Sequence, residues 1–320
     1  MAHFFAKSIF HRAIALVLIS IISFLMVHLA PGSPSQIDPT NPKLTKESIE
    51  NYRRIFHLDK PLYVQYYLFY KEMFTGQLIS TKDNQPVFGK IWERFLNSLP
   101  LFIVGTLITW TLSFPVGIRA AIRRGSAYDR STTFLAYFLI SIPGFFLAYI
   151  LIIFTVNYLQ IPVLGIRTFG MQEVGGLTAF MDRVWHLVLP SLLGAIGGIA
   201  VLSRYVRGQM LEVEGQDYIR TARAKGLPDD TVHYKHALRN ALMPFVTMFG
   251  LILPGLIGGS VITETIFAWP GMGRLDYDAI ISRDYPVVLA LNFFSAVLVL
   301  AGTFLSDVLY IFVDPRVKYD

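Results

Sequence analysis

Long apolar segments alternate with short polar connections along most of the chain. An ionised side chain near the centre of a bilayer costs roughly 2.5 to 3.5 kcal/mol on insertion scales, so charged residues mark where such segments end. Each segment reaches the roughly 20 residues with which a helix crosses a ~30 Å hydrocarbon core. Six membrane-spanning helices are therefore expected: residues 13–30, between Arg94 and Arg119, between Arg130 and Arg167, between Arg183 and Arg204, between Arg239 and Glu264, and from Tyr285 to Val313, interrupted only by Asp307.

This pattern predicts an all-α polytopic membrane protein. Residues 1–30 form the N-terminus and first helix, residues 31–94 a helical segment outside the cytoplasm, residues 95–313 the remaining five helices with a cytoplasmic loop at about 204–240, and residues 314–320 a tail. A cleaved secretory signal is the alternative for the first helix. The apolar run is long for a signal, and no clear small-x-small cleavage site follows it, which favours an uncleaved helix.

The distribution of basic residues predicts the orientation, because short cytoplasmic connections are enriched in Lys and Arg. With the N-terminus in the cytoplasm, the outer short loops hold four basic residues: Arg167, Arg183, Arg274 and Arg283. The inner side then holds fifteen: Lys7, Arg12, Arg119, Arg123, Arg124, Arg130, Arg204, Arg207, Arg220, Arg223, Lys225, Lys235, Arg239, Arg316 and Lys318. Both termini are expected to face the cytoplasm.

The outer segment of residues 31–94 carries helical signals of its own. Thr45 can cap a helix, Leu44 and Ile49 have the spacing of a hydrophobic staple, and Ile49, Tyr52, Ile55 and Phe56 share one face. A second helix is expected after Pro61, where YVQYYLFY supplies aromatic residues suited to a membrane boundary. A structural cap on the helix ends is favoured over a separate binding domain.

Composition narrows the class of protein. Hydrophobic residues make up 53% of the 320 residues and charged residues only 16%, which excludes an ordinary soluble enzyme and a disordered chain. The net charge is +6, and the basic residues lie between the apolar segments. Lipid headgroups are therefore expected as the anionic neighbours, and nucleic acid is not. The absence of cysteine excludes disulfides and thiol chemistry.

The connection between the fourth and fifth apolar segments is longer than a turn requires. Asp217 can cap a short helix from Tyr218 to Lys225, Gly226 suits a left-handed exit, and Pro228 prevents continuation. Asp229 or Asp230 can start a further helix toward Arg239. Ala222, Ala224 and Gly226 would leave a surface for close approach, flanked by Arg220, Arg223 and Lys225. The residues alone leave two interpretations open: a helix that docks into a partner, or a basic loop that fixes topology or contacts lipid.

The run DYIRTARAKGLPDDTVHYKHALRNALMP resembles the cytoplasmic loop of ABC-transporter permeases, in the version carried by the first of the two permeases of dipeptide, oligopeptide and nickel importers. Further motifs carry the resemblance along nearly the whole chain: LAPGSP, LDKPLYVQY, TETIFAWPGMGRL, RDYPVV and DPRVKY. Two differences from the subgroup occur: Gln77 and Ile79 stand where Gly-Asp-Leu-Gly is common, and His57 stands where Gly is common.

The resemblance implies a type I ABC importer permease fold and a transport subunit that is not an enzyme. The loop would form a coupling helix that inserts into a cytoplasmic ATPase, and the role falls on Asp217, Tyr218, Arg220, Thr221, Ala222, Arg223, Ala224, Lys225, Gly226 and Leu227. The implied partners are a second, related permease in a heterodimer, two ATPases and an extracytoplasmic substrate-binding protein, in a bacterial inner membrane. Peptides are the expected substrate; nickel or other metal chelates, glutathione and oligosaccharides remain alternatives.

No GxxxxGK[ST] phosphate loop occurs in the sequence, so ATP and its Mg²⁺ are expected on the partner ATPases, with no cofactor or metal on this chain.

Candidate residues for the path or gate are Pro254, Gly255, Gly258, Gly259, Glu264, Trp269 and Asn292. The turn after Glu264 is a candidate for closing the outer mouth, and Asp307 is expected to pair with a basic residue or with headgroup water. A passive channel or secondary transporter is the competing class, whereas an intramembrane serine protease lacks its motif. His233 and His236 are interpreted as a solvated face instead of a metal pair.

Overall fold

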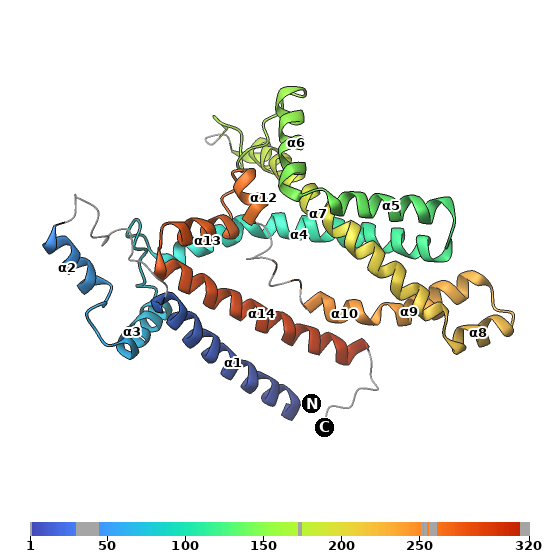
Figure 1. The fold of residues 1–320 in the computed structure, drawn as a ribbon, viewed down its shortest axis with the longest axis horizontal. Coiled ribbons are helices and arrows are strands. Elements are labelled where there is room, and N and C mark those ends of the chain that lie inside the picture. Colours follow the sequence, from blue (N-terminus) through green and yellow to red (C-terminus); the bar gives the residue numbers. More distant parts are fainter. Residues whose placement is uncertain are drawn as a thin grey trace.

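The computed structural model describes residues 2–29, 45–171, 175–250, 252, 255 and 261–313, and these are almost entirely helical (Figure 1). Within those ranges the only β-type pairing is an isolated bridge between Ile79 and Pro86. The helices are α1 (Ala2–Leu29), α2 (Lys46–Ile55), α3 (Leu62–Thr75), α4 (Val87–Ile122), α5 (Ala127–Ser141), α6 (Gly144–Asn157), α7 (Gly176–Glu214), α8 (Asp217–Ala224), the π-helix η2 (Thr231–Ala237), α9 (Leu238–Ala241), α10 (Met243–Gly250), α12 (Val261–Ile266), α13 (Met272–Ile281) and α14 (Tyr285–Val313).

Four of these helices are long and apolar enough to cross a membrane: Ala6–Leu29 of α1, all of α4 and α7, and Tyr285–Leu309 of α14. They correspond to the first, second, fourth and sixth predicted helices. α4 and α7 extend beyond the charged residues used to delimit them, because those residues lie on helical turns outside the apolar core. The fifth predicted helix falls on α10 and α12 and on intervening residues that lie largely outside the described part of the chain.

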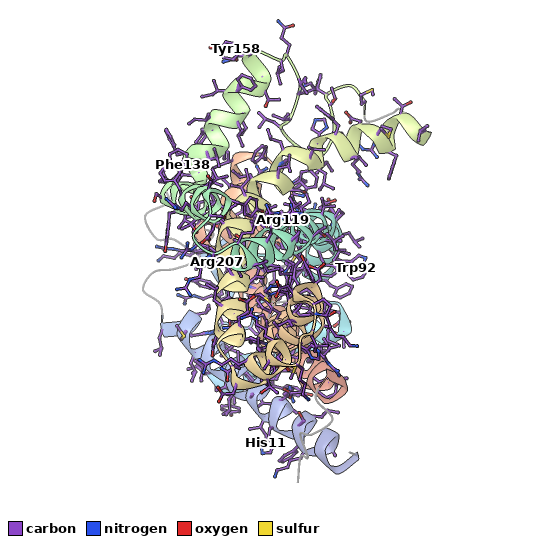
Figure 2. The ribbon with its side chains drawn as sticks, turned by 90° about the vertical axis from the view of Figure 1, so that its right-hand side faces the viewer. His11, Trp92, Arg119, Phe138, Tyr158 and Arg207 are labelled. Atoms are coloured by element: carbon purple, nitrogen blue, oxygen red, sulfur yellow. The ribbon has the colours of Figure 1, made fainter. Side chains whose placement is uncertain are left out.

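The third predicted span is two helices, α5 and α6, that meet at 93°. The break lies at Ile142 and Pro143, whose ψ angles of 123° and 129° are extended. Pro143 then serves as the N-cap of α6, where its missing N–H costs no hydrogen bond. Tyr158, just past the end of α6, therefore lies well away from Phe138 in α5 (Figure 2). The change of direction at Pro143 and Gly144 is sharper than a kink within one helix.

α4 and α7 pack closely along small residues. A Cβ on Gly117 would lie 2.4 Å from the carbonyl oxygen of Ser203, and one on Gly198 would lie 2.8 Å from the side chain of Thr109. Contacts this short leave no space for a side chain, so these glycines set the distance between the two helices. Gly194 of α7, in contrast, has open space around its Cβ position.

α1 and α14 lie side by side (Figure 1), and an ion pair links them near one end. Arg12 Nη2 lies 2.5 Å from Asp307 Oδ2, and the same guanidinium sits 5.3 Å from the ring centroid of Phe304. The predicted basic partner of Asp307 is thereby confirmed as Arg12.

The outer segment contains both predicted helices, α2 and α3. α2 begins directly after Thr45, as expected, and Leu44 lies outside the described residues. His57 has a φ of +54°, in the left-handed region. That backbone explains why glycine suits this position, and histidine is one of the residues that tolerate it better than most. α4 begins at Val87, earlier than the boundary at residue 94 predicted for the outer segment.

Candidate functional site

The loop predicted at about 204–240 contains a short helix, α8, that ends at a left-handed glycine. Gly226 has a φ of +73°, and Leu227 N donates to the carbonyl of Ala222, so the helix stops as the sequence predicts. The N-cap is Gln216, one residue earlier than predicted; Asp217 occupies the first helical turn, where its charge suits the helix dipole. The predicted helix after Pro228 begins at Asp229 and includes the π-helical turn η2.

α8 has one buried and one exposed side. Ile219 is fully buried and Ala222 is 8% exposed, and both pack on the rest of the chain. Ala222 therefore does not belong to a free docking surface, which corrects that part of the prediction: its i+3 spacing from Ile219 places it on the buried face. The other predicted coupling residues are exposed: Asp217, Tyr218, Arg220, Thr221, Arg223, Ala224, Lys225, Gly226 and Leu227.

The buried side of α8 joins a hydrophobic cluster shared by several long helices. The cluster combines Ile118 and Ala121 of α4, Leu202, Val206 and Met210 of α7, Ile219 and Ala222 of α8, Val232 and Ala237 of η2, Ala241 of α9 and Phe245 of α10. Met210, Ile219 and Val232 are fully buried. Closely packed interiors transmit displacement, so a force on α8 reaches α4, α7 and α10 directly.

Polar contacts fasten η2 and α9 to the neighbouring helices. His233 Nδ1 lies 2.8 Å from Glu214 Oε1 at the end of α7, and Asn240 Nδ2 donates to the Tyr218 hydroxyl at 2.8 Å. His233 is only 9% exposed, so its interpretation as part of a solvated face is wrong. The i, i+3 spacing alone did not reveal the carboxylate partner, because Glu214 is 19 residues away.

An ion pair lies between α5 and α7, close to this cluster. Arg207 donates to Asp129 through Nε at 2.6 Å and Nη2 at 2.9 Å, and the backbone N–H of Gly125 donates to the same carboxylate. Asp129 is 4% exposed. Arg207 lies on the α7 side of the α4 and α7 pair (Figure 2). Two parallel bonds fix both distance and orientation, so α5 is held to the same block as α8.

A buried carboxylate, Glu264 of α12, faces the first turn of α13. It is 0% exposed and accepts hydrogen bonds from the Ser98 hydroxyl at 2.7 Å and from Arg274 N at 2.9 Å. Arg274 lies in the first turn of α13, where a carboxylate is favourable. A Cβ on Gly271 would lie 2.2 Å from Glu264 Oε1, which explains the glycine.

Trp269 belongs to the same structure. It is 3% exposed, and its Nε1 donates to the carbonyl of Asn97 at 3.0 Å. Asn97 Nδ2 in turn donates to the carbonyl of Pro270. The turn that follows Glu264 is therefore packed onto the start of α4.

A cavity of about 270 Å³ lies between α4, α7 and the segment around α12. Its lining includes the hydroxyl residues Ser98, Thr106, Thr109, Ser191 and Thr263, together with Phe102, Trp110 and Gly255. Of the predicted path residues, Gly255 lines this cavity and Glu264 is bonded to its Ser98. Asn292 is exposed on α14 and does not line it; Pro254, Gly258 and Gly259 lie outside the described residues.

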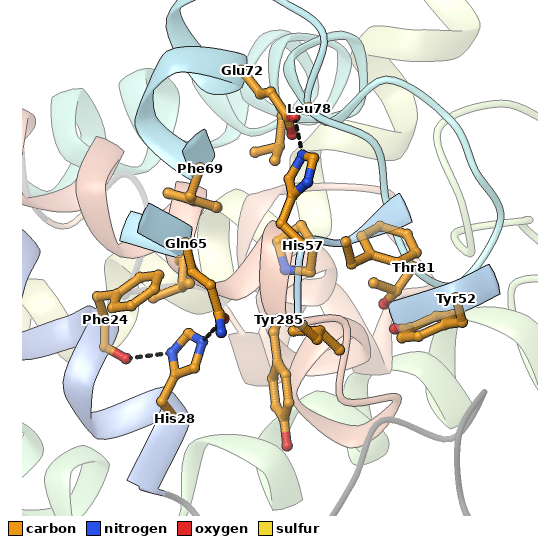
Figure 3. Close-up of a pocket in the computed structure, with 14 residues that line it drawn as sticks. Phe24, His28, Tyr52, His57, Gln65, Phe69, Glu72, Leu78, Thr81 and Tyr285 are labelled. Carbon is orange, nitrogen blue, oxygen red and sulfur yellow. Dashed lines mark hydrogen bonds and ion pairs between the residues drawn. The ribbon is translucent and has the colours of Figure 1, made fainter. Parts of the chain in front are cut away.

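A smaller cavity of about 70 Å³ lies under the outer segment, between α1, α2, α3 and the start of α14 (Figure 3). His28 lies 2.8 Å from the carbonyl of Phe24 and 3.1 Å from Gln65 Oε1, and His57 lies 2.7 Å from Glu72 Oε1. Burial raises the pKa of Tyr52 to about 12, so this phenol stays neutral. The His28 contact attaches α3 to α1, and the His57 contact attaches the segment after α2 to α3. Among the described residues, no three His, Cys, Asp or Glu side chains gather to hold a metal ion.

Comparison with known proteins shows that the sequence matches a family of membrane proteins. Residues 113–319 match the family described as binding-protein-dependent transport system inner membrane component, and residues 1–113 match the N-terminal model of the same description. The chain belongs to this family of membrane transport components. It is a permease subunit and not an enzyme.

Individual relatives agree over almost the full length. The chain is 40% identical to the oligopeptide transport system permease protein AppB of Bacillus subtilis, and 37% identical to the dipeptide transport system permease protein DppB of Escherichia coli, with 94% of each chain covered in both comparisons. It is 35% identical to the di/tripeptide transport system permease protein DppB of Pseudomonas aeruginosa, again over 94% of each chain.

A solved structure supports the fold. The inward-facing MetNI methionine ABC transporter matches with a TM-score of 0.52 at 20% identity, covering 72% of this chain and 99% of that one. At this identity the likeness concerns the arrangement of helices alone. The all-α, type I importer permease fold expected from the sequence is confirmed.

Proposed function

We propose that this chain is one permease of an ATP-driven peptide importer in a bacterial inner membrane, and that the exposed side of α8 receives mechanical work from a cytoplasmic ATPase. The observation that carries the proposal is that α8 has one buried side and one exposed side. Ile219 and Ala222 join it to a core shared with five other helices, while Tyr218 and Leu227 remain 42% and 37% exposed. Exposed apolar side chains on a rigidly anchored helix suit a protein partner better than water.

The energy must come from elsewhere, since the sequence contains no phosphate loop. Two ATPases that close on ATP and Mg²⁺ would draw two such helices together, one from this chain and one from a second, related permease. The packed cluster would convert that motion into a tilt of α4, α7 and α10 and so alternate access between the two sides. Both termini and α8 would lie in the cytoplasm, as the basic residues favour.

Peptide specificity rests on the names of the relatives and on the lining of the path. No ionised side chain occurs among the described residues that line the cavity between α4 and α7. A neutral path suits a substrate that an extracytoplasmic binding protein selects and delivers.

The proposal is tested by purifying the tagged chain from its native membranes and assaying the preparation for ATPase subunits and ATP-dependent peptide uptake in proteoliposomes. The variant Thr221→Trp places a bulky side chain on the exposed side of α8, and we expect it to lose the ATPase during purification. Thr178→Trp, at an exposed position at the other end of α7, serves as the matched control and should retain it. A chain that purifies alone and conducts without ATP would be a channel, which would contradict the proposal.

A further inference from the structure

The cavity between α4 and α7 has a hydroxyl group that nothing in the described structure satisfies. Ser191 is 1% exposed and lines the cavity, and its Oγ has no hydrogen-bond partner among the described residues. A buried hydroxyl without a partner is unfavourable and calls for an explanation, and a ligand that comes and goes would supply one.

The residues that face Ser191 across the cavity form one stripe on α4. Ser98, Phe102, Gly105, Thr106 and Thr109 recur at spacings of three and four residues, the period of one helix face. The opposite face of α4 carries Ile103 and Leu107, which are 45% and 60% exposed and suit lipid or another helix. The polar stripe is therefore confined to the cavity side.

The chemistry of the lining indicates the class of ligand. Hydroxyl groups both donate and accept hydrogen bonds, and the aromatic rings of Phe102 and Trp110 offer apolar contact. An uncharged group with a donor and an acceptor side by side fits such a lining, and the amide of a peptide main chain is that group. Side-chain charges would find no counter-ion among the described lining residues.

We infer that Ser191, with Thr106 and Thr109 opposite, forms a transient binding site for a peptide main-chain amide during passage. The inference rests on the proposed transport function and adds a place and a chemistry to it. Binding to the main chain would accept peptides of different sequence, because every residue presents the same amide.

Thiol labelling tests the position of the site, since the chain contains no native cysteine. In the complete transporter, reconstituted with its ATPases and binding protein, the thiol of Ser191→Cys should react with a small water-soluble methanethiosulfonate. Tri-alanine and ATP together should slow that reaction several-fold. The thiol of Leu107→Cys, on the opposite face of α4 that suits lipid, should not react with the water-soluble reagent whether or not peptide is present. A thiol at position 191 that is unreactive throughout turnover, or that peptide leaves unprotected, would overturn the inference.

Uptake measurements test the chemistry. Removing one neutral hydrogen bond should lower the tri-alanine uptake rate of Ser191→Ala by about two- to tenfold, and Ser191→Thr, which keeps the hydroxyl, should stay near wild type. Ser113→Ala is the matched control. Ser113 lies on α4 and, like Ser191 on α7, is buried with an unpartnered hydroxyl, but it does not line the cavity. Equal uptake by Ser191→Ala and wild type would contradict the amide site and leave peptide transport standing. A wild-type complex that imports neither di-alanine nor tri-alanine would contradict the transport proposal itself.

Discussion

At the scale of single residues, α8 and the turn between α12 and α13 depend on glycines for different physical reasons. Gly226 has a left-handed backbone with open space around its Cβ position, so its constraint is conformational. Gly271 has an ordinary φ of −106°, and its constraint is steric because the Glu264 carboxylate occupies the space of a side chain. The two sites therefore predict different kinds of damage.

Replacing Gly226 with leucine should uncouple transport from ATP hydrolysis while the protein still inserts. A leucine with a left-handed backbone costs about 1 to 2 kcal/mol. We expect the backbone after α8 to change its conformation to avoid this cost. Peptide transported per ATP hydrolysed in proteoliposomes measures the effect. Gly226→Asn should retain coupling, because asparagine tolerates this backbone. Gly170→Leu, at a positive-φ glycine with open space between α6 and α7, is the control for strain alone; an equal loss there, or full coupling in Gly226→Leu, would contradict the account.

Replacing Gly271 with alanine should destabilise the protein by about 1 to 3 kcal/mol, the usual cost of overpacking a buried site. The added methyl group would displace Glu264 from the Ser98 hydroxyl and from Arg274 N. Thermal unfolding in detergent measures the loss. Gly89→Ala, where a Cβ meets no atom within 4 Å, should leave stability nearly unchanged, and similar stability for both variants would argue against the buried contact.

At the scale of elements, α8 is the end of a rigid block and not an independent loop. Its buried side shares one hydrophobic cluster with α4, α7, η2 and α10, and the Asp129–Arg207 pair adds α5 to that block. The small residues between α4 and α7 keep these two helices in direct contact. A displacement of α8 should therefore move several helices together.

Removing Arg207 should destabilise this block by about 3 kcal/mol, near the low end for a buried ion pair because the Arg207 side chain is 26% exposed. The loss comes mainly from leaving the Asp129 carboxylate buried without its partner. The double variant Asp129→Asn with Arg207→Ala should thus be more stable than Arg207→Ala alone. The denaturation midpoints of the wild type, the two single variants and the double variant form the thermodynamic cycle. A double variant as unstable as the sum of the two singles would show that the groups do not interact.

At the scale of the whole molecule, α8 and the outer segment of α2 and α3 lie at opposite ends of the long axis (Figure 1). The hydroxyl-lined cavity lies between α4 and α7, the same helices that hold the buried side of α8. Work applied at α8 can therefore act on the walls of the proposed path through two continuous helices.

Apolar segment length and terminal signals predicted most of the helices, since both depend on local sequence. The exit at Gly226 and the break at Pro143 are set by single residues and were predictable for the same reason. The burial of Ala222, the partner of His233 and the bond from Ser98 to Glu264 join residues distant in sequence, so local patterns do not reveal them. The stripe of Ser98, Thr106 and Thr109 carried a helical period and was the one available signal for the cavity.

Cross-linking along α8 tests the central claim most directly. Single cysteines at the exposed positions Asp217, Thr221 and Ala224 and at the buried positions Ile219 and Ala222, in a chain with no native cysteine, are treated with a thiol-to-amine cross-linker in the complete transporter. The account predicts cross-links to an ATPase subunit from the three exposed positions and none from the two buried ones. Exposed positions that form no cross-link in any nucleotide state, while the ATPase remains bound to the complex, would contradict it.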